Sequence, residues 1–157
     1  MRRWGWILAI LAAITLGLAA SHASAPVLAL TGFTAIDAVP TPADRIGEQQ
    51  LKITSSDVTI KLSNAVIGRI EATGSMLPTL NQDSTALMIP PKSDNDIREG
   101  DIVVYESEDG LIVHRILRVS KDEKGWFATA KGDNAPEADK EKIRREQIRY
   151  IVIGILY

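Results

Sequence analysis

Apolar residues crowd the first 36 positions of the chain. After Arg2 and Arg3, no charged residue appears until Asp37. This stretch is longer than the roughly 20 apolar residues that a membrane-spanning helix needs. Because basic residues before a span favour a cytoplasmic amino terminus, we expect a single-pass anchor in the cell membrane within residues 1–36, contacting the lipid bilayer through residues 4–30. The rest of the chain is then expected on the extracytoplasmic side.

A cleaved signal peptide is the alternative interpretation of the same segment. Small residues at Ser21 and Ala23, or at Ala23 and Ala25, fit the small-x-small pattern of a cleavage site. Cleavage after Ala25 would place Pro26 beside the scissile bond, where its ring restricts the backbone. Cleavage after Ala23 avoids this restriction, so the sequence leaves both interpretations open.

The remainder of the chain divides into a polar segment and a β-rich segment. Residues 37–50 contain two prolines and show neither helical nor strand periodicity, which predicts a linker. Over residues 51–157, short β-branched runs alternate with turn-forming clusters, which predicts a mostly antiparallel β domain. Only residues 138–147 have a helical composition, and this stretch is too short for more than a turn or two. The predicted strands are 58–62, 65–72, 102–105, 111–119, 126–130 and 148–156.

Charge and composition narrow the chemistry. The net charge is −2, and setting aside Arg2 and Arg3 leaves 16 basic residues against 20 acidic ones. This balance gives no electrostatic reason to expect nucleic acid as a partner. The absence of cysteine excludes disulfides, thiolate metal sites and cysteine nucleophiles. With only two histidines, a histidine-rich metal site is not expected either, and we expect neither a metal nor another cofactor.

A serine stands where an apolar run is interrupted. The sequence TGSMLPTL at 73–80 places a glycine before Ser75 and a proline, Pro78, three residues after it. Because proline stops regular strand pairing, we expect Ser75 to be exposed at the end of a strand. A serine hydroxyl is a poor nucleophile unless a base lies within hydrogen-bond reach. Taken alone, the block predicts only a turn.

A second block surrounds one of the two histidines. In the sequence LIVHRILRV at 111–119, the alternation of a strand places His114 on the same face as Ile112 and Ile116. An imidazole on an apolar face is either a core histidine with a hydrogen-bond partner or a functional base. His114 is therefore a candidate base for Ser75, and a core histidine is the alternative.

A third block, KGDNAPEAD at 131–139, contains Asp133 and Asp139. Either carboxylate is able to orient an imidazole. The alternatives are a solvated acidic turn and a loose cation-binding loop, although the run lacks the ligand periodicity and closing glutamate of a calcium loop. Both aspartates are therefore candidate partners of His114.

Together these blocks resemble type I signal peptidases. The resemblance is to the branch found in archaea, the endoplasmic reticulum and some spore-forming bacteria, in which a histidine replaces the lysine base. It covers about residues 70–139 and rests on four blocks in family order, which are GSMLPT at 74–79, GDIVV at 100–104, VHRI at 113–116 and KGDN at 131–134 with Asp139. The resemblance implies an antiparallel β catalytic domain over 51–157, of the type shared with LexA-like self-cleaving repressors, after one transmembrane helix.

The resemblance also implies a role for each matching residue. Ser75 corresponds to the nucleophile, His114 to the general base, and Asp139 to the carboxylate that orients the imidazole. Asp133 corresponds to a supporting acidic position. The hydroxyl of Thr73 falls where the family has a serine that stabilises the oxyanion together with the Ser75 backbone N–H.

The activity implied is that of a membrane-bound serine endopeptidase. Such an enzyme removes signal peptides from translocated preproteins by cutting after small residues, as in Ala-x-Ala sites, and it has potential partners in the secretion machinery. An extended substrate is expected along a strand near 70–73. The substrate-binding candidates are Ile70, Ala72, Met76 and Pro78.

The chain departs from the family pattern at two points, and two rival interpretations are considered beside the resemblance. Ala130 stands where a threonine usually precedes the KGDN block, and some fifty residues separate the apolar segment from Ser75. One rival is a self-cleaving repressor, which shares the β scaffold but uses a lysine base where this chain has His114. The other is a non-catalytic binding module that has kept the same scaffold.

Overall fold

The structure is a computed structural model and describes residues 39–157. The predicted membrane anchor and its alternative cleavage sites therefore lie outside the described residues. Within residues 39–157, no helix is long and apolar enough to span a membrane.

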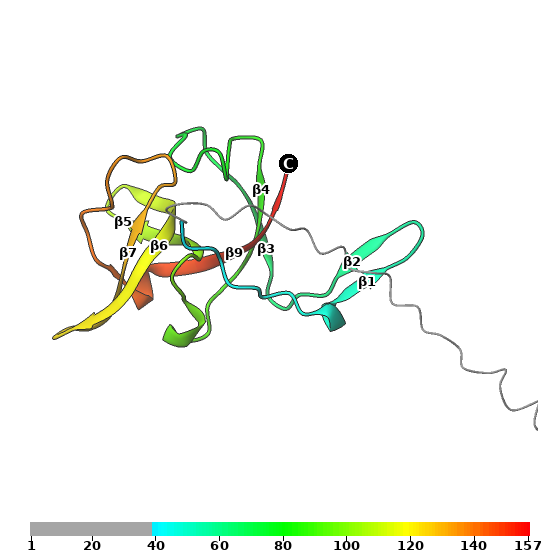
Figure 1. The fold of residues 1–157 in the computed structure, drawn as a ribbon, viewed down its shortest axis with the longest axis horizontal. Coiled ribbons are helices and arrows are strands. Elements are labelled where there is room, and N and C mark those ends of the chain that lie inside the picture. Colours follow the sequence, from blue (N-terminus) through cyan, green and yellow to red (C-terminus); the bar gives the residue numbers. More distant parts are fainter. Residues whose placement is uncertain (1–38) are drawn as a thin grey trace, which may run out of the picture. The chain divides into compact units, whose positions relative to one another are not determined.

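The predicted mostly antiparallel β architecture is confirmed (Figure 1). Residues 39–157 contain nine strands and three short 3₁₀ helices. The strands are β1 Leu51–Ile53, β2 Val58–Ile60, β3 Val66–Arg69, β4 Thr85–Ile89, β5 Ile102–Ser107, β6 Gly110–Asp122, β7 Gly125–Lys131, β8 Ile143–Arg144 and β9 Ile148–Leu156. The 3₁₀ helices are η1 Glu48–Gln50, η2 Asp94–Asp96 and η3 Arg145–Gln147.

Seven of the strands form one antiparallel sheet in the order β3-β4-β9-β5-β6-β7-β8. Strand β9 pairs with both β4 and β5, so the last strand in the sequence joins the two halves of the sheet. The pairings of β4 with β9, of β5 with β9 and of β6 with β7 each contain a register shift. Such irregularities bend a sheet and increase its twist. The two remaining strands, β1 and β2, pair only with each other.

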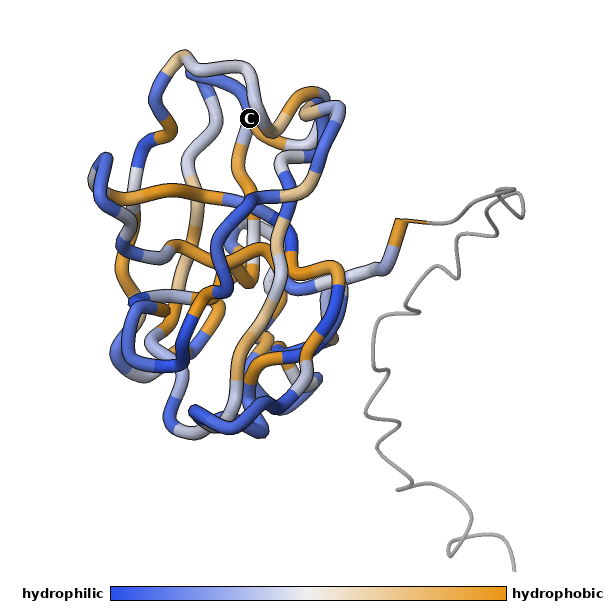
Figure 2. Tube along the Cα trace, turned by 90° about the vertical axis from the view of Figure 1, so that its left-hand side faces the viewer, coloured by the Kyte–Doolittle hydropathy of each residue, from blue (hydrophilic) through white to orange (hydrophobic). Residues whose placement is uncertain are grey.

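The core consists of two apolar clusters that meet at β5. Val103 and Tyr105 belong to one cluster, whereas Ile102 and Val104 belong to the other. Successive strand residues point to opposite faces, so β5 is buried on both sides. This explains why its first four residues are all buried and form a continuous apolar run. Figure 2 shows long apolar stretches that cross the body of the domain, with polar segments at many of the bends between them.

The structure differs from the sequence prediction in four strands. Strands β1, β4 and β8 were not predicted, and β3 ends at Arg69 rather than at residue 72. Strand β4, with the sequence TALMI, has the helix-favouring residues Ala, Leu and Met at its centre but lies between β3 and β9, so tertiary pairing overrides its local preference. The stretch 138–147, predicted to supply at most a helical turn or two, contains the short strand β8 and the single 3₁₀ turn η3.

The polar segment predicted as a linker lies against the β domain through residues 40–45, which we call the strap. The buried side chain of Asp101 accepts hydrogen bonds from the Arg45 guanidinium and from the backbone N–H of Ala43 at 3.1 Å. The same carboxylate accepts the backbone N–H of Arg98 at 2.8 Å. A buried carboxylate needs such partners to compensate for its lost hydration, so the strap completes the solvation of Asp101.

Gly100 is where the strap passes closest to the sheet. Its φ of +93° is unfavourable for residues with a side chain. A Cβ at this position would overlap the carbonyl oxygen of Thr41. The Arg115 guanidinium joins the two segments at this point, because it donates to the carbonyl oxygens of Gly100 at 3.0 Å and Pro40 at 3.3 Å. Gly100 is therefore required both for its own turn and for docking of the strap.

We predict that Gly100→Ala destabilises the domain much more than Gly110→Ala does. Both glycines have positive φ, at +93° and +112°, but a Cβ at Gly110 would meet nothing within 4 Å. The backbone strain of about 1–3 kcal/mol is common to both variants. Only Gly100→Ala also displaces the strap from Asp101, and breaking a buried ion pair costs about 3–5 kcal/mol. The free energy of unfolding, measured by denaturant titration of the full chain in detergent, should show this gap, and equal losses would contradict the strap contact.

Candidate active site

Ser75 lies in a turn that is fixed from two sides. The prediction that Ser75 ends a strand is wrong, because β3 ends at Arg69 and residues 75–79 form a turn. The buried side chain of Met76 anchors this turn in the core. The backbone carbonyl of Ser75 accepts the N–H of Asn134 at 2.8 Å, so the loop after β7 lies directly against the serine.

His114 is oriented by Asp139. Both carboxylate oxygens of Asp139 lie 2.9 Å from His114 Nδ1. The backbone N–H of Asp139 donates to the carbonyl of Ala130 at 2.8 Å, which ties the aspartate to the end of β7. A carboxylate at Nδ1 accepts the proton held there, so in the neutral ring Nε2 is the unprotonated acceptor. The pair therefore presents a basic nitrogen on the side of the ring away from Asp139.

Tyr105 holds Asp139 in place. This role of Tyr105 was not predicted from the sequence. Its hydroxyl donates to Asp139 Oδ2 at 2.7 Å. Burial, followed by the hydrogen bond to the Asp139 carboxylate, raises the pKa of the Tyr105 phenol well above its usual value. The hydroxyl therefore remains a donor at any working pH. The sequence did contain a signal for this role, namely a tyrosine within an apolar predicted strand. A buried tyrosine hydroxyl needs a polar partner, so such a residue predicts a polar side chain nearby.

Gly132 brings the histidine and the serine segment together. A Cβ at this position would lie 2.6 Å from the Ser75 carbonyl oxygen and 2.9 Å from His114 Nε2. Both distances are shorter than a real Cβ contact, so only glycine lets the loop lie between these two groups. The role of Gly132 was not predicted from the sequence, although the residue belongs to the KGDN block.

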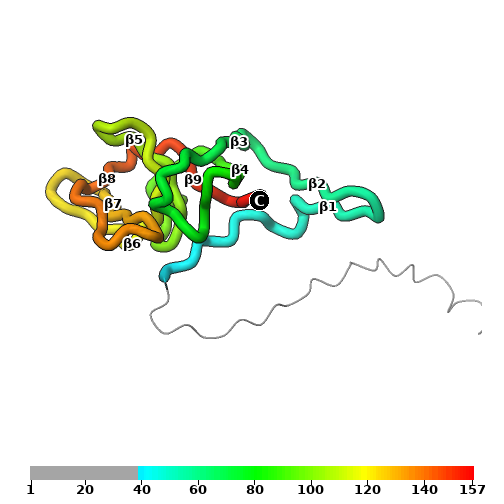
Figure 3. Tube along the Cα trace, turned by 90° about the horizontal axis from the view of Figure 1, so that it is seen from above, coloured from blue at the N-terminus to red at the C-terminus, as the bar shows by residue number. Residues whose placement is uncertain are grey.

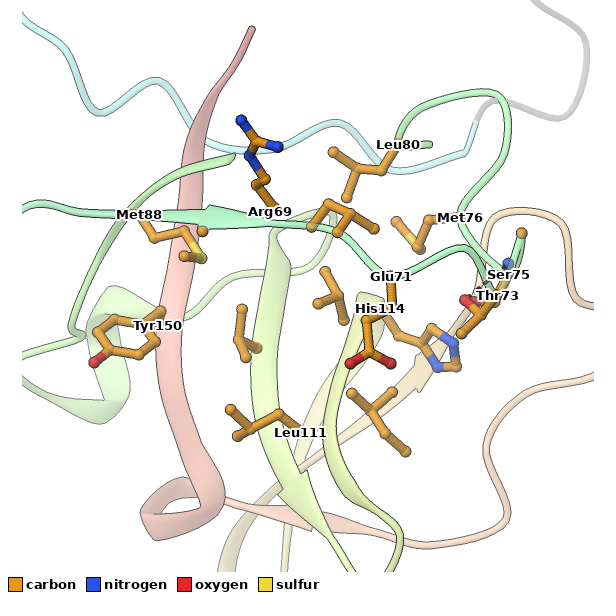
Figure 4. Close-up of a pocket in the computed structure, with 16 residues that line it drawn as sticks. Arg69, Glu71, Thr73, Ser75, Met76, Leu80, Met88, Leu111, His114 and Tyr150 are labelled. Atoms are coloured by element: carbon orange, nitrogen blue, oxygen red, sulfur yellow. Dashed lines mark hydrogen bonds between the residues drawn. The ribbon is translucent and has the colours of Figure 1, made fainter. Parts of the chain in front are cut away.

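The Ser75 hydroxyl points toward Thr73 in this structure. The two hydroxyl oxygens are 3.3 Å apart, and the Ser75 backbone N–H donates to Thr73 Oγ1 at 3.5 Å. Within residues 39–157, no hydrogen bond joins Ser75 Oγ to His114. Figure 4 shows Ser75 and Thr73 at one end of a cleft with the His114 ring beside them. The three side chains thus share one site, without a direct serine–histidine hydrogen bond.

Asp133, the other candidate partner of the histidine, is engaged elsewhere. Its carboxylate accepts two hydrogen bonds from Arg115, at 2.8 Å from Nε and 2.7 Å from Nη2, and a third from the Thr79 hydroxyl. Burial by itself raises the pKa of Asp133, but the bonds from Arg115 and Thr79 outweigh it and hold the pKa below its usual value. Asp133 therefore fastens the Ser75 turn to β6, whereas Asp139 contacts the imidazole.

A mostly apolar cleft of about 430 Å³ extends from the serine and the histidine. Of the predicted substrate-binding residues, Ile70 and Met76 line it, whereas Ala72 and Pro78 are exposed and do not. The lining residues are Gly68, Arg69, Ile70, Glu71, Thr73, Gly74, Ser75, Met76, Leu80, Met88, Val104, Leu111, Ile112, Val113, His114 and Tyr150. A channel of this kind suits a segment of chain with small or apolar side chains.

Two further observations bear on the chemistry of the site. In the part of the chain that the structure describes, no group of three or more histidine, aspartate or glutamate side chains is arranged to hold a metal ion. Comparisons with models of protein families, with curated proteins and with solved structures found no match to this chain. The side chains present are a hydroxyl, a carboxylate-oriented imidazole and a neighbouring hydroxyl donor, the set that nucleophilic acyl transfer requires.

We predict that the link between Asp133 and Arg115 makes stability depend on pH in the acid range. At pH 7, Asp133→Asn should be less stable by about 1.5–3 kcal/mol, the usual worth of hydrogen bonds to charged groups. Because the pKa of Asp133 is lowered in the folded state, this contribution is complete above about pH 4, where the unfolded carboxyl titrates. This stabilising contribution is lost as the pH falls through the lower pKa of Asp133 in the folded state. The free energies of unfolding of the wild type and Asp133→Asn should therefore become equal at low pH.

Denaturant titrations between pH 7 and pH 2 measure this convergence. Asp109→Asn, which changes an exposed turn aspartate, is the matched control and should differ little from the wild type at any pH. A constant difference between wild type and Asp133→Asn over the whole range would contradict the assignment.

Proposed function

We propose that the chain is a membrane-anchored serine endopeptidase of the type I signal peptidase kind, which cleaves translocated proteins after small residues. The observation that carries this proposal is the orientation of His114. Asp139 contacts Nδ1, whereas Nε2 and the Ser75 carbonyl oxygen both border the space where a Cβ on Gly132 would lie. A base nitrogen is thus directed toward the serine segment at the end of an apolar cleft. The four sequence blocks of the family resemblance support the same function.

In the proposed mechanism, the Ser75 hydroxyl turns from Thr73 toward His114 Nε2. His114 takes the hydroxyl proton as the oxygen attacks the scissile carbonyl carbon, and the imidazolium then gives that proton to the leaving amine. Water then gives a proton to Nε2 and attacks the carbonyl carbon of the acyl-serine ester. The bond to the serine oxygen breaks, and the imidazolium returns the proton to that oxygen, which releases the carboxylic acid product and restores the Ser75 hydroxyl. Asp139 stabilises the imidazolium in both steps. A side-chain rotation of this kind fits the tightening of catalytic hydrogen bonds on substrate binding.

The negative charge on the substrate oxygen requires donors close to the nucleophile. The Ser75 N–H and the Thr73 hydroxyl lie next to each other, and we assign them as the oxyanion hole. In the resting structure the N–H is directed at Thr73 Oγ1, so both groups become donors to substrate only when that contact opens. Removal of one such donor costs about 2.7–4 kcal/mol of transition-state stabilisation in other enzymes.

The substrate is proposed to lie extended along residues 70–73 and in the cleft. Ile70 and Met76 line the cleft together with Ser75, and we propose that they contact the small side chains next to the cleaved bond. Ala72 and Pro78 are exposed and do not line the cleft, and their contact with substrate remains a proposal from the sequence. Small-residue cleavage sites follow the apolar core of signal peptides, and the proposed anchor at residues 4–30 would hold the enzyme in the membrane where such substrates emerge. We also propose that the enzyme has partners in the secretion machinery.

The position of Lys131 favours a histidine base over a lysine base. Self-cleaving repressors use a lysine next to the serine, and Lys131 is the nearest candidate in the KGDN block. Its ammonium group donates instead to the carbonyl of Ala135 in its own loop. His114 therefore remains the residue directed at the serine.

We predict that Ser75→Ala abolishes processing without loss of the fold. Removing the nucleophilic hydroxyl should lower cleavage by about 10³-fold or more, whereas the truncation leaves the buried anchor Met76 untouched. The assay uses full-length protein in vesicles with a preprotein that carries an Ala-x-Ala site, read by the size shift on processing. Ser63→Ala, at an exposed turn, is the matched control and should cleave normally. Undiminished cleavage by Ser75→Ala would refute the protease assignment, and a non-catalytic module would show no cleavage in the wild type.

A further inference from the structure

The cleft that extends from the serine and the histidine contains a carboxylate. Glu71, four residues before Ser75, lines the cleft and points its side chain into it (Figure 4). Among the described residues that line the cleft, Glu71 is the only acidic one, and most of the others are apolar. In an apolar pocket, a few placed polar groups select the ligand, so Glu71 is a candidate for recognising the substrate.

A tight turn presents the Glu71 side chain to the cleft. Strand β3 ends at Arg69, and the backbone N–H of Thr73 then donates to the Glu71 carbonyl oxygen at 2.8 Å. This hydrogen bond engages the main-chain acceptor of Glu71 within the chain itself. The side chain is therefore the part of Glu71 that is left to contact a segment lying in the cleft.

The Glu71 carboxylate is not paired with a cation in the part of the chain that the structure describes. None of the ion pairs within residues 39–157 includes it. The basic residue nearest in the sequence, Arg69, points its guanidinium to the other side of the chain in Figure 4. By contrast, Glu106 on β5 has a cationic partner in Arg149. Glu71 is thus an unpaired charge in the place where a ligand would lie.

The cleft is also open to a ligand. No residue of the hairpin β1–β2 lines it, and Figures 1 and 3 both show this hairpin extending away from the seven-stranded sheet. Glu71 itself is exposed, so its carboxylate is hydrated before a substrate binds. A substrate segment that fills the cleft displaces part of this water.

Loss of this water makes the cleft selective. Removing the hydration of a charge costs free energy unless another group replaces the lost hydrogen bonds. A methyl group on the substrate replaces none of them, whereas the ammonium of a lysine or the guanidinium of an arginine forms a charge-assisted hydrogen bond with the carboxylate. An acidic substrate side chain adds like-charge repulsion. The carboxylate therefore favours basic substrate side chains over neutral ones, and neutral ones over acidic ones.

Strand geometry identifies the substrate position that meets Glu71. Side chains of an extended segment alternate, so the first and third residues before the cleaved bond point into the cleft and the second points out. In the proposed mechanism, the first residue lies beside Ser75 and Thr73. The third lies about 7 Å further along, at two residues of strand rise, and Glu71 likewise lies two residues before Thr73. The long, flexible stem of a lysine spans the remaining gap.

We propose that Glu71 is a specificity-determining residue, which favours preproteins with lysine or arginine as the third residue before the cleaved bond. The small residue next to that bond is unchanged, so the preferred site is basic-x-Ala rather than Ala-x-Ala. This inference rests on the proposed peptidase function, because it assigns the substrate of the same site.

Peptide cleavage tests the preference. Full-length protein in detergent is assayed on four peptides that share one sequence and an alanine before the cleaved bond. Three of them carry alanine, lysine or glutamate as the third residue before that bond, and the fourth carries lysine as the second. For the wild type, we expect kcat/KM to be about three- to fivefold higher with lysine than with alanine at the third residue, and lowest with glutamate. Lysine at the second residue should give no such gain.

Variants at Glu71 assign the preference to its charge. Glu71→Gln keeps the shape of the side chain but not its charge, so the preference for lysine over alanine should disappear. Glu71→Lys should reverse the order, so that the glutamate peptide is cut fastest. Glu123→Gln, at an exposed turn outside the cleft, is the matched control and should retain the wild-type preference. The wild-type preference should also shrink in about 1 M salt, which screens exposed charges.

Each of three results overturns the proposal. An unchanged preference in Glu71→Gln would mean that the carboxylate does not contact the substrate. If Glu71→Gln slows all four peptides equally, Glu71 acts on His114 or on the fold instead. Equal gains from lysine at the second and third residues would mean that the acidic domain attracts any basic peptide.

Binding measurements separate this inference from the proposed function. Ser75→Ala should bind peptides without cutting them, and the fluorescence anisotropy of labelled peptides gives their Kd. Suppose that the wild type cuts no peptide, but Ser75→Ala binds the third-residue lysine peptide more tightly than the alanine peptide and loses this difference on adding Glu71→Gln. That result would uphold the Glu71 contact and sink the protease proposal. Ser75-dependent cleavage without a lysine preference would do the reverse, and neither binding nor cleavage would overturn both.

Discussion

One buried guanidinium connects the parts of this domain. Arg115 donates to both oxygens of Asp133 and to the carbonyls of Gly100 and Pro40. It thereby fastens the loop after β7, the turn before β5 and the strap to a single point on β6. The planar, always charged guanidinium is suited to this because it offers several donors in a fixed geometry. Loss of any one partner would leave a buried charge incompletely bonded, which explains why these three segments are expected to act as a unit.

Side chains alternate between the two faces of β6, and this alternation connects the hydrogen bonds of Arg115, which we call the clamp, to the proposed chemistry. Arg115 directs its side chain to one face of the strand, and the preceding residue, His114, directs its ring to the other, where Asp139 and Tyr105 fix it. The loop that Asp133 anchors also contains Gly132, whose backbone contacts both the ring and the Ser75 carbonyl. The position of the base relative to the serine therefore depends on the same loop that the clamp holds.

Much of the fold was predictable from the sequence, because β-branched runs separated by turn residues are a strong local signal. Strand β4 was not, since its sequence TALMI acquires strand geometry only from its neighbours β3 and β9. Ser75, His114 and the aspartates were recognisable as candidates because reactive side chains stood among apolar or turn-forming residues. The residue pattern alone did not distinguish Asp139 from Asp133, and only the family resemblance gave them different roles. The roles of Tyr105 and Gly132 were not predicted, because they depend on contacts between segments distant in the chain. The strap looked like a linker for the same reason, since its partner Asp101 lies more than fifty residues away.

The central claim is that His114 activates Ser75 as a nucleophile, and covalent trapping tests it most directly. A serine-directed phosphonate is added to the full-length protein in detergent, and the modified residue is located by mass spectrometry of peptides. The account predicts a single adduct on Ser75 that forms with the wild type and is lost in His114→Ala, because the hydroxyl is a poor nucleophile without its base. An adduct on another serine, or labelling of Ser75 at the same rate in His114→Ala, would contradict it.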